Sequence, residues 1–496
     1  MEQMKKLYLG IDVGTTHLKV CAVDARGRCL AVAERDQELT PDPVFGDSIP
    51  AELLFTRCAD CIREVSETVD RAQIAAIGIT SMAEAGIPVN AGGEALMPLI
   101  PWNQKGLGSQ RPDFLVSVTD WALYQRTGLC WHPKYTINRI WQMRRQQEAL
   151  YAETDCFLSV SDYVLYRLTG QKLTDESLAC RTMLYNIHEQ CWDRELAAFA
   201  GVSDKLPAVV TQAGAWPRLS RQLADKWGLG REVRVSVGGH DHLCAAQALG
   251  IGGKDVLNSM GTSEVYVGFL ETLPDLHSLY ERGILLGRFG GRYYWICNMP
   301  SSGASMEWLR GLLMRRPTQG KDDAEAAHGG QKMEYQELMQ ASLSYGAHGR
   351  HTPLLYLPFV NGAGTHRKRK LPGGFLGADM STGSTELIRA VCEGIACESA
   401  VILENLAAAG IVTETIHAVG GGILNRGLMQ AKADFTAHIY ETDIQVQAAA
   451  AGAALCAAGL TGHARLRDRI QPDSQALAYC QKKYQRYTRL TQMLGE

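Results

Sequence analysis

The sequence of 496 residues lacks any run of roughly 20 uninterrupted apolar residues, so it offers no candidate membrane-spanning helix. Its opening makes a poor signal peptide, because Asp12 interrupts the apolar stretch just before a glycine turn. The net charge of −3 gives no electrostatic reason to expect nucleic acid or an anionic membrane as a partner. These absences favour a cytoplasmic protein that acts on small molecules.

The 14 cysteines are scattered along the chain and are not spaced like the ligands of a metal site. Cys58 and Cys61 come nearest to a C-x-x-C motif, and no second pair lies at zinc-ligand spacing. Because Cys61 falls in a predicted amphipathic helix over 51–70, we expect reduced, structural thiols. What the chain does have is an ordinary globular composition, 46% hydrophobic and 21% charged.

Strand and helix patterns alternate along the chain, which predicts an α/β fold. Residues 7–13 and 18–23 form a predicted hairpin whose tip is Gly14-Thr15-Thr16, and a strand at 74–80 follows the helix. The opening pattern returns at 255–269 around a second tip, Gly261-Thr262-Ser263. The repeat predicts two related lobes, residues 1–250 and 251–496. An irregular insertion is expected in the second lobe at 315–350.

The two hairpin tips carry the first chemical signal. Glycine permits a tight turn with exposed N–H groups for phosphate oxygens, and the threonine hydroxyls add donors. Asp12, before the first tip, could hold Mg²⁺ through water, and Lys19 could neutralise phosphate charge. A lone Gly-Thr-Thr is more often a simple turn, but two tips in matching positions favour phosphate binding.

Three further patterns suggest a cleft with a ligand. Asp241, after His240 at a predicted strand-to-helix junction, could accept a hydroxyl proton or merely cap the helix. The turn 420–422 with Asn425 could hold a nucleotide or be a structural turn. An acidic residue, a tryptophan and an amide follow the strand at 74–80 and could grip a polyhydroxylated ligand, although each alone is more often packing or solvated: Glu84, Trp102 and Asn103.

These residues resemble the FGGY carbohydrate kinase family, of the actin-like, ribonuclease H-like ATPase superfamily. The likeness runs in order through nearly the whole chain. The matching segments are LGIDVGTT (9–16), DYVLYRLTG (162–170), RTMLYN (181–186), GHD (239–241), GTS (261–263), SGASMEWL (302–309), GGFLG (373–377), LIRAVCEG (387–394) and GGG (420–422) with Asn425.

The resemblance implies two ribonuclease H-like lobes that close on a sugar or polyol and MgATP. Asp241 would then be the general base for a hydroxyl that attacks the γ-phosphate, and Asp12 would help place Mg²⁺. Residues of the tips and glycine turns would handle ATP: Gly14, Thr15, Thr16, Lys19, Gly261, Thr262, Gly303, Gly421 and Asn425. Glu84, Trp102, Asn103, His240 and Asp241 would contact the sugar. Many members are dimers, but nothing in this sequence identifies an interface.

The substrate region departs from the family pattern. Trp102-Asn103-Gln104-Lys105 lacks the family's usual carboxylate, and Glu84 resembles the glycerol-kinase arrangement but follows Ala83 instead of arginine. His240 is more similar to kinases of deoxy-ketohexoses than to those of xylulose. The sequence therefore names neither the substrate nor the phosphorylated hydroxyl. A kinase of a non-sugar molecule, a catalytically lapsed regulatory protein and an actin-like chaperone ATPase remain alternatives.

Where the family has Gly-Glu-Arg-Thr-Pro, this chain has Gly362-Ala363-Gly364-Thr365-His366, and a basic run over 366–370 follows. A solvated loop is favoured over nucleic-acid binding or contact with a phosphate. Neutralising residues 367–370 is therefore expected to leave turnover within about tenfold, since exposed charges contribute little.

Overall fold

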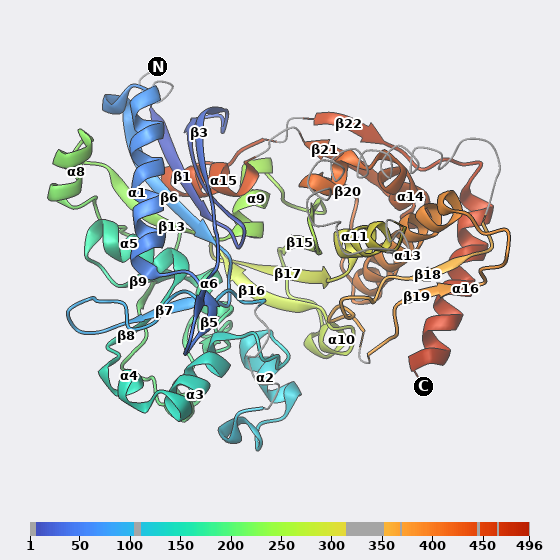
Figure 1. The fold of residues 1–496 in the computed structure, drawn as a ribbon, viewed down its shortest axis with the longest axis horizontal. Coiled ribbons are helices and arrows are strands. Elements are labelled where there is room, and N and C mark those ends of the chain that lie inside the picture. The colour runs from blue at the N-terminus through green and yellow to red at the C-terminus, as the bar shows by residue number, and fades with distance from the viewer. Residues whose placement is uncertain are drawn as a thin grey trace, which may run out of the picture.

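The computed structural model describes residues 6–103, 111–313, 352–367, 370–443, 447–463 and 466–495. It consists of two lobes, each built on one large β-sheet (Figure 1). The described N-terminal end lies in the first lobe and the C-terminal end in the second (Figure 1). The predicted α/β alternation and the two-lobed fold are confirmed.

The first sheet has the strand order β13-β6-β1-β2-β3. Its strands are β1 (Leu7–Val13), β2 (His17–Asp24), β3 (Cys29–Asp36), β6 (Ile74–Ser81) and β13 (Arg234–His240). β1 pairs antiparallel with β2 and parallel with β6, which pairs parallel with β13. The carboxyl ends of β1, β6 and β13 therefore meet at one edge, the place where open α/β sheets bind ligands.

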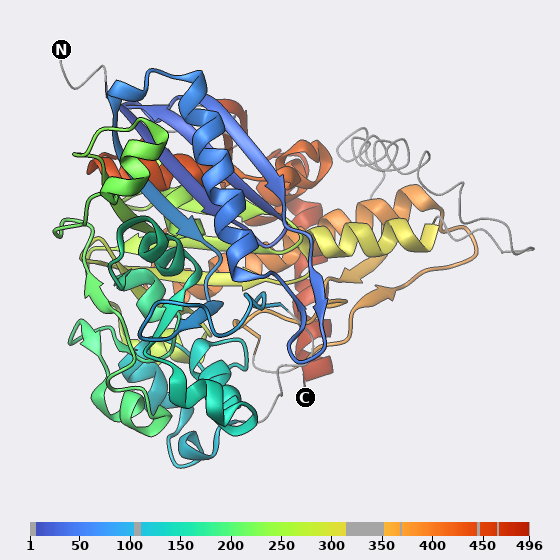
Figure 2. The same cartoon turned by 60° about the vertical axis from the view of Figure 1, so that its left-hand side comes forward.

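Two helices cover this sheet on opposite faces. α1 (Ala51–Thr68) packs on β2 and β3, and α15 (Ala448–Ala458), from the far end of the chain, packs on β1, β6 and β13 (Figures 1 and 2). The approach of α15 is close enough to require glycine. A Cβ at Gly10 would lie 1.8 Å from Ala450 O, and one at Gly78 would lie 1.8 Å from Ala453 O.

The second sheet has the order β16-β17-β15-β14-β20-β21-β22. Its strands are β14 (Val256–Met260), β15 (Glu264–Leu270), β16 (Leu285–Phe289), β17 (Arg292–Met299), β20 (Thr415–Val419), β21 (Ile439–Asp443) and β22 (Leu466–Ile470). The run β17-β15-β14-β20-β21 repeats the order and the directions of β3-β2-β1-β6-β13. The repeated hairpins read from the sequence are thus the equivalent parts of two similar sheets.

The other elements of the first lobe are β4 (Thr40–Asp42), β5 (Gly46–Ser48), η2 (Arg71–Gln73), β7 (Gly86–Val89), η3 (Asp113–Leu115), α2 (Asp120–Thr127), α3 (Thr136–Gln146), α4 (Glu148–Glu153), β8 (Cys156–Ser159), α5 (Val160–Thr169), β9 (Leu173–Asp175), α6 (Glu176–Cys180), β10 (Tyr185–Asn186), β11 (Cys191–Trp192), α7 (Arg194–Ala200), β12 (Ala208–Val210), α8 (Arg221–Trp227) and α9 (Asp241–Leu249). Those of the second are α10 (Leu276–Glu281), α11 (Ser302–Leu313), β18 (Leu355–Leu357), β19 (Gly374–Leu376), α13 (Ser384–Ala408), η4 (Gly421–Leu424), α14 (Arg426–Thr436) and α16 (Leu477–Gly495).

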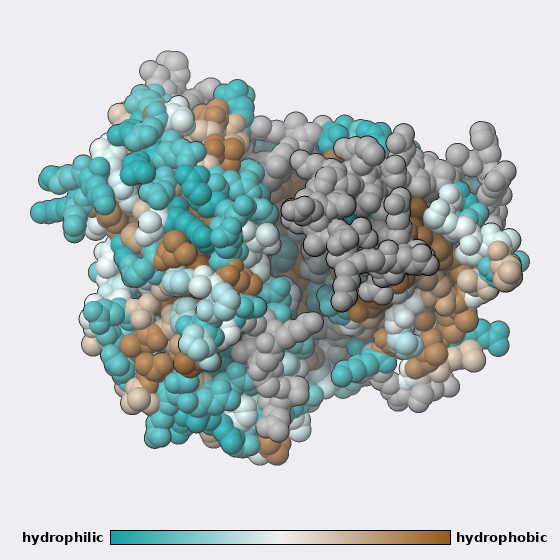
Figure 3. All heavy atoms as spheres, viewed as in Figure 1, coloured by the Kyte–Doolittle hydropathy of each residue, from teal (hydrophilic) through white to brown (hydrophobic). Residues whose placement is uncertain are grey.

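Apolar side chains do not gather into one large patch on the face of the first lobe seen in Figure 3. That face is mostly hydrophilic, with separate small hydrophobic areas. No helix in the described ranges is long and apolar enough to cross a bilayer. Cys58 and Cys61 are free and buried on α1, in accord with structural thiols.

The solvated loop expected at residues 366–370 is wrong for His366 and Arg367, whereas Lys370 is exposed. His366 is 7% exposed, and its Nε2 lies 2.5 Å from Glu398 Oε1 on α13. Arg367 donates to both oxygens of Glu398, at 2.9 and 2.6 Å, and Tyr487 of α16 donates to the same carboxylate. A run of cations in the sequence does not reveal a buried partner that comes 31 residues later. Lys368, Arg369, Gln104, Lys105 and the predicted insertion at 315–350 lie outside the described residues.

Candidate active site

A pocket of about 200 Å³ lies between the two lobes. The first lobe contributes the charged side chains and a tryptophan. The second lobe contributes mainly strand residues near its hairpin tip. The lining residues are Thr15, Met82, Ala83, Glu84, Trp102, Lys134, Arg181, His240, Asp241 and His242 from the first lobe, and Ser263, Val265, Leu285, Ile296 and Asn298 from the second. Residues predicted from four separate parts of the sequence therefore share one cavity.

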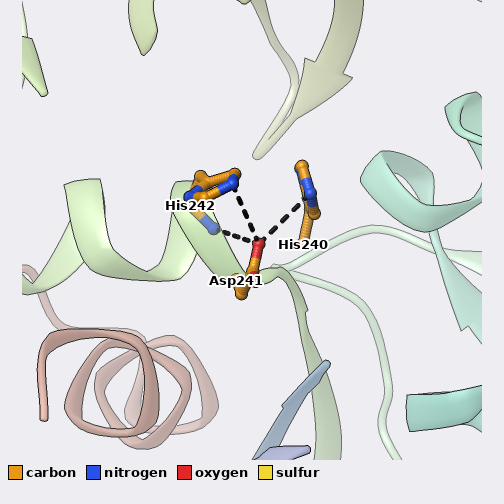
Figure 4. A group of neighbouring side chains, drawn as sticks. All are labelled: His240, Asp241 and His242. Atoms are coloured by element: carbon orange, nitrogen blue, oxygen red, sulfur yellow. Dashed lines mark hydrogen bonds and ion pairs between the residues drawn. The ribbon is translucent and has the colours of Figure 1, made fainter. Parts of the chain in front are cut away.

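Asp241 is the first residue of α9, directly after β13 ends at His240. Its Oδ1 accepts the His242 N–H at 2.7 Å and lies 3.2 Å from His240 Nε2 and 3.7 Å from His242 Nε2 (Figure 4). His240 occupies the N-cap position without a side-chain cap hydrogen bond, and Asp241 accepts one backbone N–H of the first turn, so a structural part in starting α9 and a part as proton acceptor are both compatible with its position. Burial lowers the pKa of His240 to about 4, so this ring is neutral at neutral pH. A part-exposed carboxylate flanked by two imidazoles is available to accept a proton.

Asp12 lies near the end of β1, opposite Lys19 of β2 and beside Thr80 of β6. Burial, followed by the negative charge of Asp241, raises the pKa of Asp12 to about 7, and Lys19 opposes the shift. Lys19 Nζ also lies 3.5 Å from Glu34 Oε1, so its charge is shared. Two nearby carboxylates without a full set of cationic partners suit a hard cation that takes oxygen ligands, such as Mg²⁺.

The second hairpin tip is braced by the start of α11. Gly261 N–H donates to Ser263 O at 2.9 Å, and Ala304 N–H donates to Thr262 O at 2.9 Å. A Cβ at Gly303 would lie 2.4 Å from Gly261 O, so only glycine allows this contact. The predicted residues Gly261, Thr262 and Gly303 thus form one packed unit, next to the pocket residue Ser263.

The glycine turn at 420–422 packs against the end of β14. Gly420 has φ of 95°, and a Cβ there would lie 2.4 Å from Met260 O, whereas a Cβ at Gly421 would meet no atom within 4 Å. Gly421 therefore borders open space beside the second tip, where a ligand could approach the backbone. Asn425 is 4% exposed and its Oδ1 accepts the Leu428 N–H at 3.0 Å, which makes it the N-cap of α14.

Glu84 is the centre of a buried charge cluster. It adopts a positive φ of 62°, a conformation that is uncommon outside glycine and that gathers at functional sites. Arg181 Nε donates to Glu84 Oε1 at 2.9 Å, Arg181 Nη2 contacts the same oxygen, and Lys134 Nζ lies 3.3 Å from it. Burial alone would raise the pKa of Glu84, but Arg181 and then Lys134 hold it well below its usual range.

Trp102 lines the pocket, and its ring centroid lies 5.7 Å from Lys134 Nζ. Arg139 of α3 fixes the chain just before it, by donating to Ile100 O at 3.0 Å and Pro101 O at 2.9 Å. Asn103 is exposed and does not line the pocket. The structure therefore brings the tryptophan, but not the asparagine, to the predicted substrate site.

Sequence reasoning missed Lys134, Arg181 and His242 as pocket residues. The absence of arginine at Ala83 left Glu84 without an obvious partner, and the structure supplies Arg181 from 97 residues later. Its segment, RTMLYN, was recognised only as a family likeness. His242 adjoins Asp241, and an aspartate between two histidines was a usable signal.

The group His240, Asp241 and His242 has ligand atoms within 4.8 Å of one another (Figure 4). Two of the three ligands are imidazoles, which suit zinc and other transition metals better than Mg²⁺. Asp12 therefore remains the better candidate for holding Mg²⁺.

Comparison with known proteins identifies the family of this chain. The family models described as "FGGY family of carbohydrate kinases" match residues 7–248 for the N-terminal domain and 256–461 for the C-terminal domain. The chain is 26% identical over 520 residues to a xylulose kinase of Escherichia coli, covering 98% of this chain and 99% of that protein.

Two solved structures show the same fold. A "xyloylose kinase" from Brucella ovis superposes with a TM-score of 0.84 at 21% identity, covering 98% of this chain and 99% of the other. A gluconate kinase from Lactobacillus acidophilus gives 0.81 at 20% identity, covering 99% and 98%. At these identities the likeness establishes the fold alone.

Proposed function

Because the chain belongs to the FGGY family of carbohydrate kinases, and is accordingly an ATP-dependent kinase of a small sugar or polyol, we propose that Asp241 is the general base of the reaction. The observation that carries this assignment is the position of Asp241 in a pocket that also holds Thr15 of the first hairpin tip and Ser263 of the second. A hydroxyl bound there would lie between a carboxylate and the groups expected to bind the γ-phosphate.

In the proposed reaction, the acceptor hydroxyl gives its proton to Asp241 as its oxygen attacks the γ-phosphate. Neutral His240 and the His242 N–H keep the Asp241 carboxylate oriented, through contacts at 3.2 and 2.7 Å. Glu84 and Trp102 would hold the acceptor. Closure of the lobes would exclude water, which would otherwise compete as phosphoryl acceptor.

The phosphates of ATP would lie between the two hairpin tips. The proposed phosphate-binding groups are Gly14, Thr15, Thr16, Lys19, Gly261, Thr262 and Gly303. Mg²⁺, when bound near Asp12, would neutralise charge on the transferred phosphate. The adenosine is proposed to lie along Gly421, beside the open space there, with Asn425 contributing chiefly as the cap that starts α14.

The division into residues 1–250 and 251–496 is kept as part of the proposal, with the phosphate-binding tips facing each other across it. A cytoplasmic location and a homodimer remain predictions, as does the absence of nucleic-acid and membrane partners. A xylulose, glycerol or gluconate-like acceptor would each be consistent with the names of related proteins.

The test is ADP release from MgATP across ketoses, polyols and their deoxy forms. We expect one compound to stimulate release, and Asp241→Asn to reduce kcat by about a hundredfold to ten-thousandfold, the usual contribution of base catalysis. Asp225→Asn is a matched control, since Asp225 forms a surface ion pair with Arg231. Near-normal turnover in Asp241→Asn would refute the role of Asp241. ATP binding without stimulation by any compound would favour a non-sugar acceptor or a regulatory protein.

A further inference from the structure

The substrate pocket contains more fixed positive charge around Glu84 than that carboxylate can neutralise. Arg181 and Lys134 both use the same oxygen, Glu84 Oε1. A third cation, Arg139, lines a separate cavity; it donates to two backbone carbonyls, and the negative charge of Glu84 acts on it. Among the described residues that line the pocket, Lys134 and Arg181 therefore share one carboxylate oxygen at this end.

Burial makes this imbalance costly. The side chains of Glu84, Arg181 and Lys134 are 6%, 4% and 18% exposed. Burial lowers the pKa of Lys134 from its ordinary value although Glu84 opposes the shift. A buried cation without full compensation is unfavourable, and a bound anion would remove much of that cost.

Hydrogen-bond donors in the cluster also lack acceptors. Arg181 Nη1 is buried and has no hydrogen-bond partner in the described part of the chain. The ring of Tyr135 also lies beside this guanidinium, with its centroid 5.3 Å from Arg181 Cζ. Lys134 Nζ has one ion-pair contact there, with Glu84, although an ammonium group offers three donors.

The other anionic side chain of the pocket does not supply the missing charge. Asp241 contacts the imidazoles of His240 and His242, and the charge of Asp241 acts on Asp12. No described ion pair joins Asp241 to Lys134 or Arg181. The pocket thus has two ends of different character, one for the reacting hydroxyl and one rich in unsatisfied cationic donors.

We propose that the acceptor is a sugar acid, a small polyhydroxylated molecule whose carboxylate binds Lys134 and Arg181 while one of its hydroxyls lies against Asp241. The inference rests on the proposed function and specifies its substrate class. A planar guanidinium matches carboxylate geometry, and charge-assisted hydrogen bonds are about twice as strong as neutral ones. A volume of about 200 Å³ falls below the usual range for drug-sized ligands and suits a short carbon chain.

The chemistry of transfer is unchanged. A bond forms between the acceptor oxygen and the γ-phosphorus, the bond from that phosphorus to the bridging oxygen of ADP breaks, and the hydroxyl proton goes to Asp241. The carboxylate of the acceptor remains a carboxylate and serves only to anchor the molecule. A neutral polyol could hydrogen-bond to the same donors but would leave their charge uncompensated.

The experiment compares pairs that differ only at one terminal carbon: five- and six-carbon aldonates, each with the alditol of the same configuration, together with ketoses. We expect one aldonate to exceed its alditol in kcat/KM by about a hundredfold, since a site built for a polar group discriminates strongly against its absence. Lys134→Met should lower kcat/KM for that acid by about 30- to 100-fold, mainly through KM. It should change the KM for ATP less than about twofold, because the phosphates bind elsewhere.

Two matched variants complete the design. Lys134→Arg keeps the charge and should retain most of the preference for the acid. Arg145→Met removes a surface cation that pairs with Asp113 and should leave the acid-to-alditol ratio unchanged.

The outcomes separate this inference from the proposed function. A neutral ketose or polyol as the preferred acceptor would overturn the sugar-acid assignment and leave the kinase proposal standing. A sugar phosphate preferred over every acid would show that the anion is a phosphate, which also overturns the assignment. A Lys134→Met effect on the KM for ATP alone would place these cations at the transferred phosphate. No phosphorylation of any compound, with ATP still bound, would overturn both proposals.

Discussion

Two buried lysine–glutamate pairs of this protein differ in how completely they are hydrogen-bonded. In the second lobe, Lys432 of α14 contacts Glu264 Oε2, and both side chains are fully buried. The same ammonium donates to three further oxygens, in Asn258 at 3.2 Å, Tyr266 at 2.7 Å and Ser399 at 3.1 Å. Glu264 in turn accepts from Ser302, so the whole group is satisfied by the protein itself.

The pair in the first lobe is built differently. Lys134 lies 3.3 Å from Glu84, and the donors that remain in that cluster face a pocket. The contrast teaches that burial alone does not separate a structural charge from a binding one. Here the two pairs differ in whether the protein supplies a complete set of partners, because an unsatisfied buried group is costly and a bound ligand can supply the missing partner.

The largest change in unfolding free energy is expected at the fully hydrogen-bonded pair of Lys432 and Glu264. Lys432→Met should lower the free energy of unfolding by about 3–5 kcal/mol, because it leaves Glu264 buried without its cation. Urea denaturation followed by tryptophan fluorescence measures the change. The double variant Lys432→Met with Glu264→Leu should recover part of the loss, and a single-variant effect under about 1 kcal/mol would contradict the comparison.

A substitution at Arg367 tests whether this residue of the basic run is a structural charge with a complete set of partners. Arg367→Ala should cost about 2–3 kcal/mol of unfolding free energy, because Glu398 loses a two-bond partner and is otherwise held by His366 and Tyr487. Turnover should stay within about tenfold, since these contacts lie outside the pocket. Arg145→Ala, at an exposed ion pair, is the control and should cost under about 1 kcal/mol. Equal losses of unfolding free energy in the two variants would mean that Arg367 behaves as an exposed, solvated charge.

The carboxylate of Asp12 lies at the candidate active site without a full set of cationic partners. The pH dependence of stability gives a third test. The Asp12 pKa of about 7 lies above the ordinary value of 3.8, so the stability of the fold falls as the pH rises from about 4 to about 7, and the full penalty is present above 7. Asp12→Asn removes that penalty. Without Mg²⁺, the variant's gain in stability over the unmodified protein should be greater at pH 8 than at pH 5 by about 2 kcal/mol. A gain that does not vary with pH would show that Asp12 titrates normally.

The smallest change in unfolding free energy is expected at Lys134, whose hydrogen-bond partners are the least complete when compared with those of Lys432. Lys134→Met should change the free energy of unfolding by less than about 1 kcal/mol, because the lost ion pair is offset by removing a poorly compensated buried cation. Thermal unfolding of this variant beside Lys432→Met gives the direct comparison. A loss as large as that of Lys432→Met would mean that Lys134 is structural.

The sequence was sufficient for the architecture and for one side of the site. Repeated hairpin tips and the junction before Asp241 are local patterns, so the tips, the two sheets and the position of Asp241 could be predicted. The partners of Glu84 could not, because Lys134 and Arg181 reach it only through tertiary packing. For the same reason, the run at 366–370 concealed its contact with Glu398, and the exposure of Asn103 was not foreseen.

The position of α15 has a consequence for how the protein is made. The first sheet is covered on one face by residues 448–458, which follow almost the whole second lobe in the chain. At a synthesis rate of about 5–20 residues per second, roughly 200 residues separate the first sheet from its cover, a delay of about 10–40 s. During that interval the apolar face of β1, β6 and β13 is not covered by α15. Gly10 and Gly78, which leave room for that helix, then face no partner, because α15 has not yet left the ribosome.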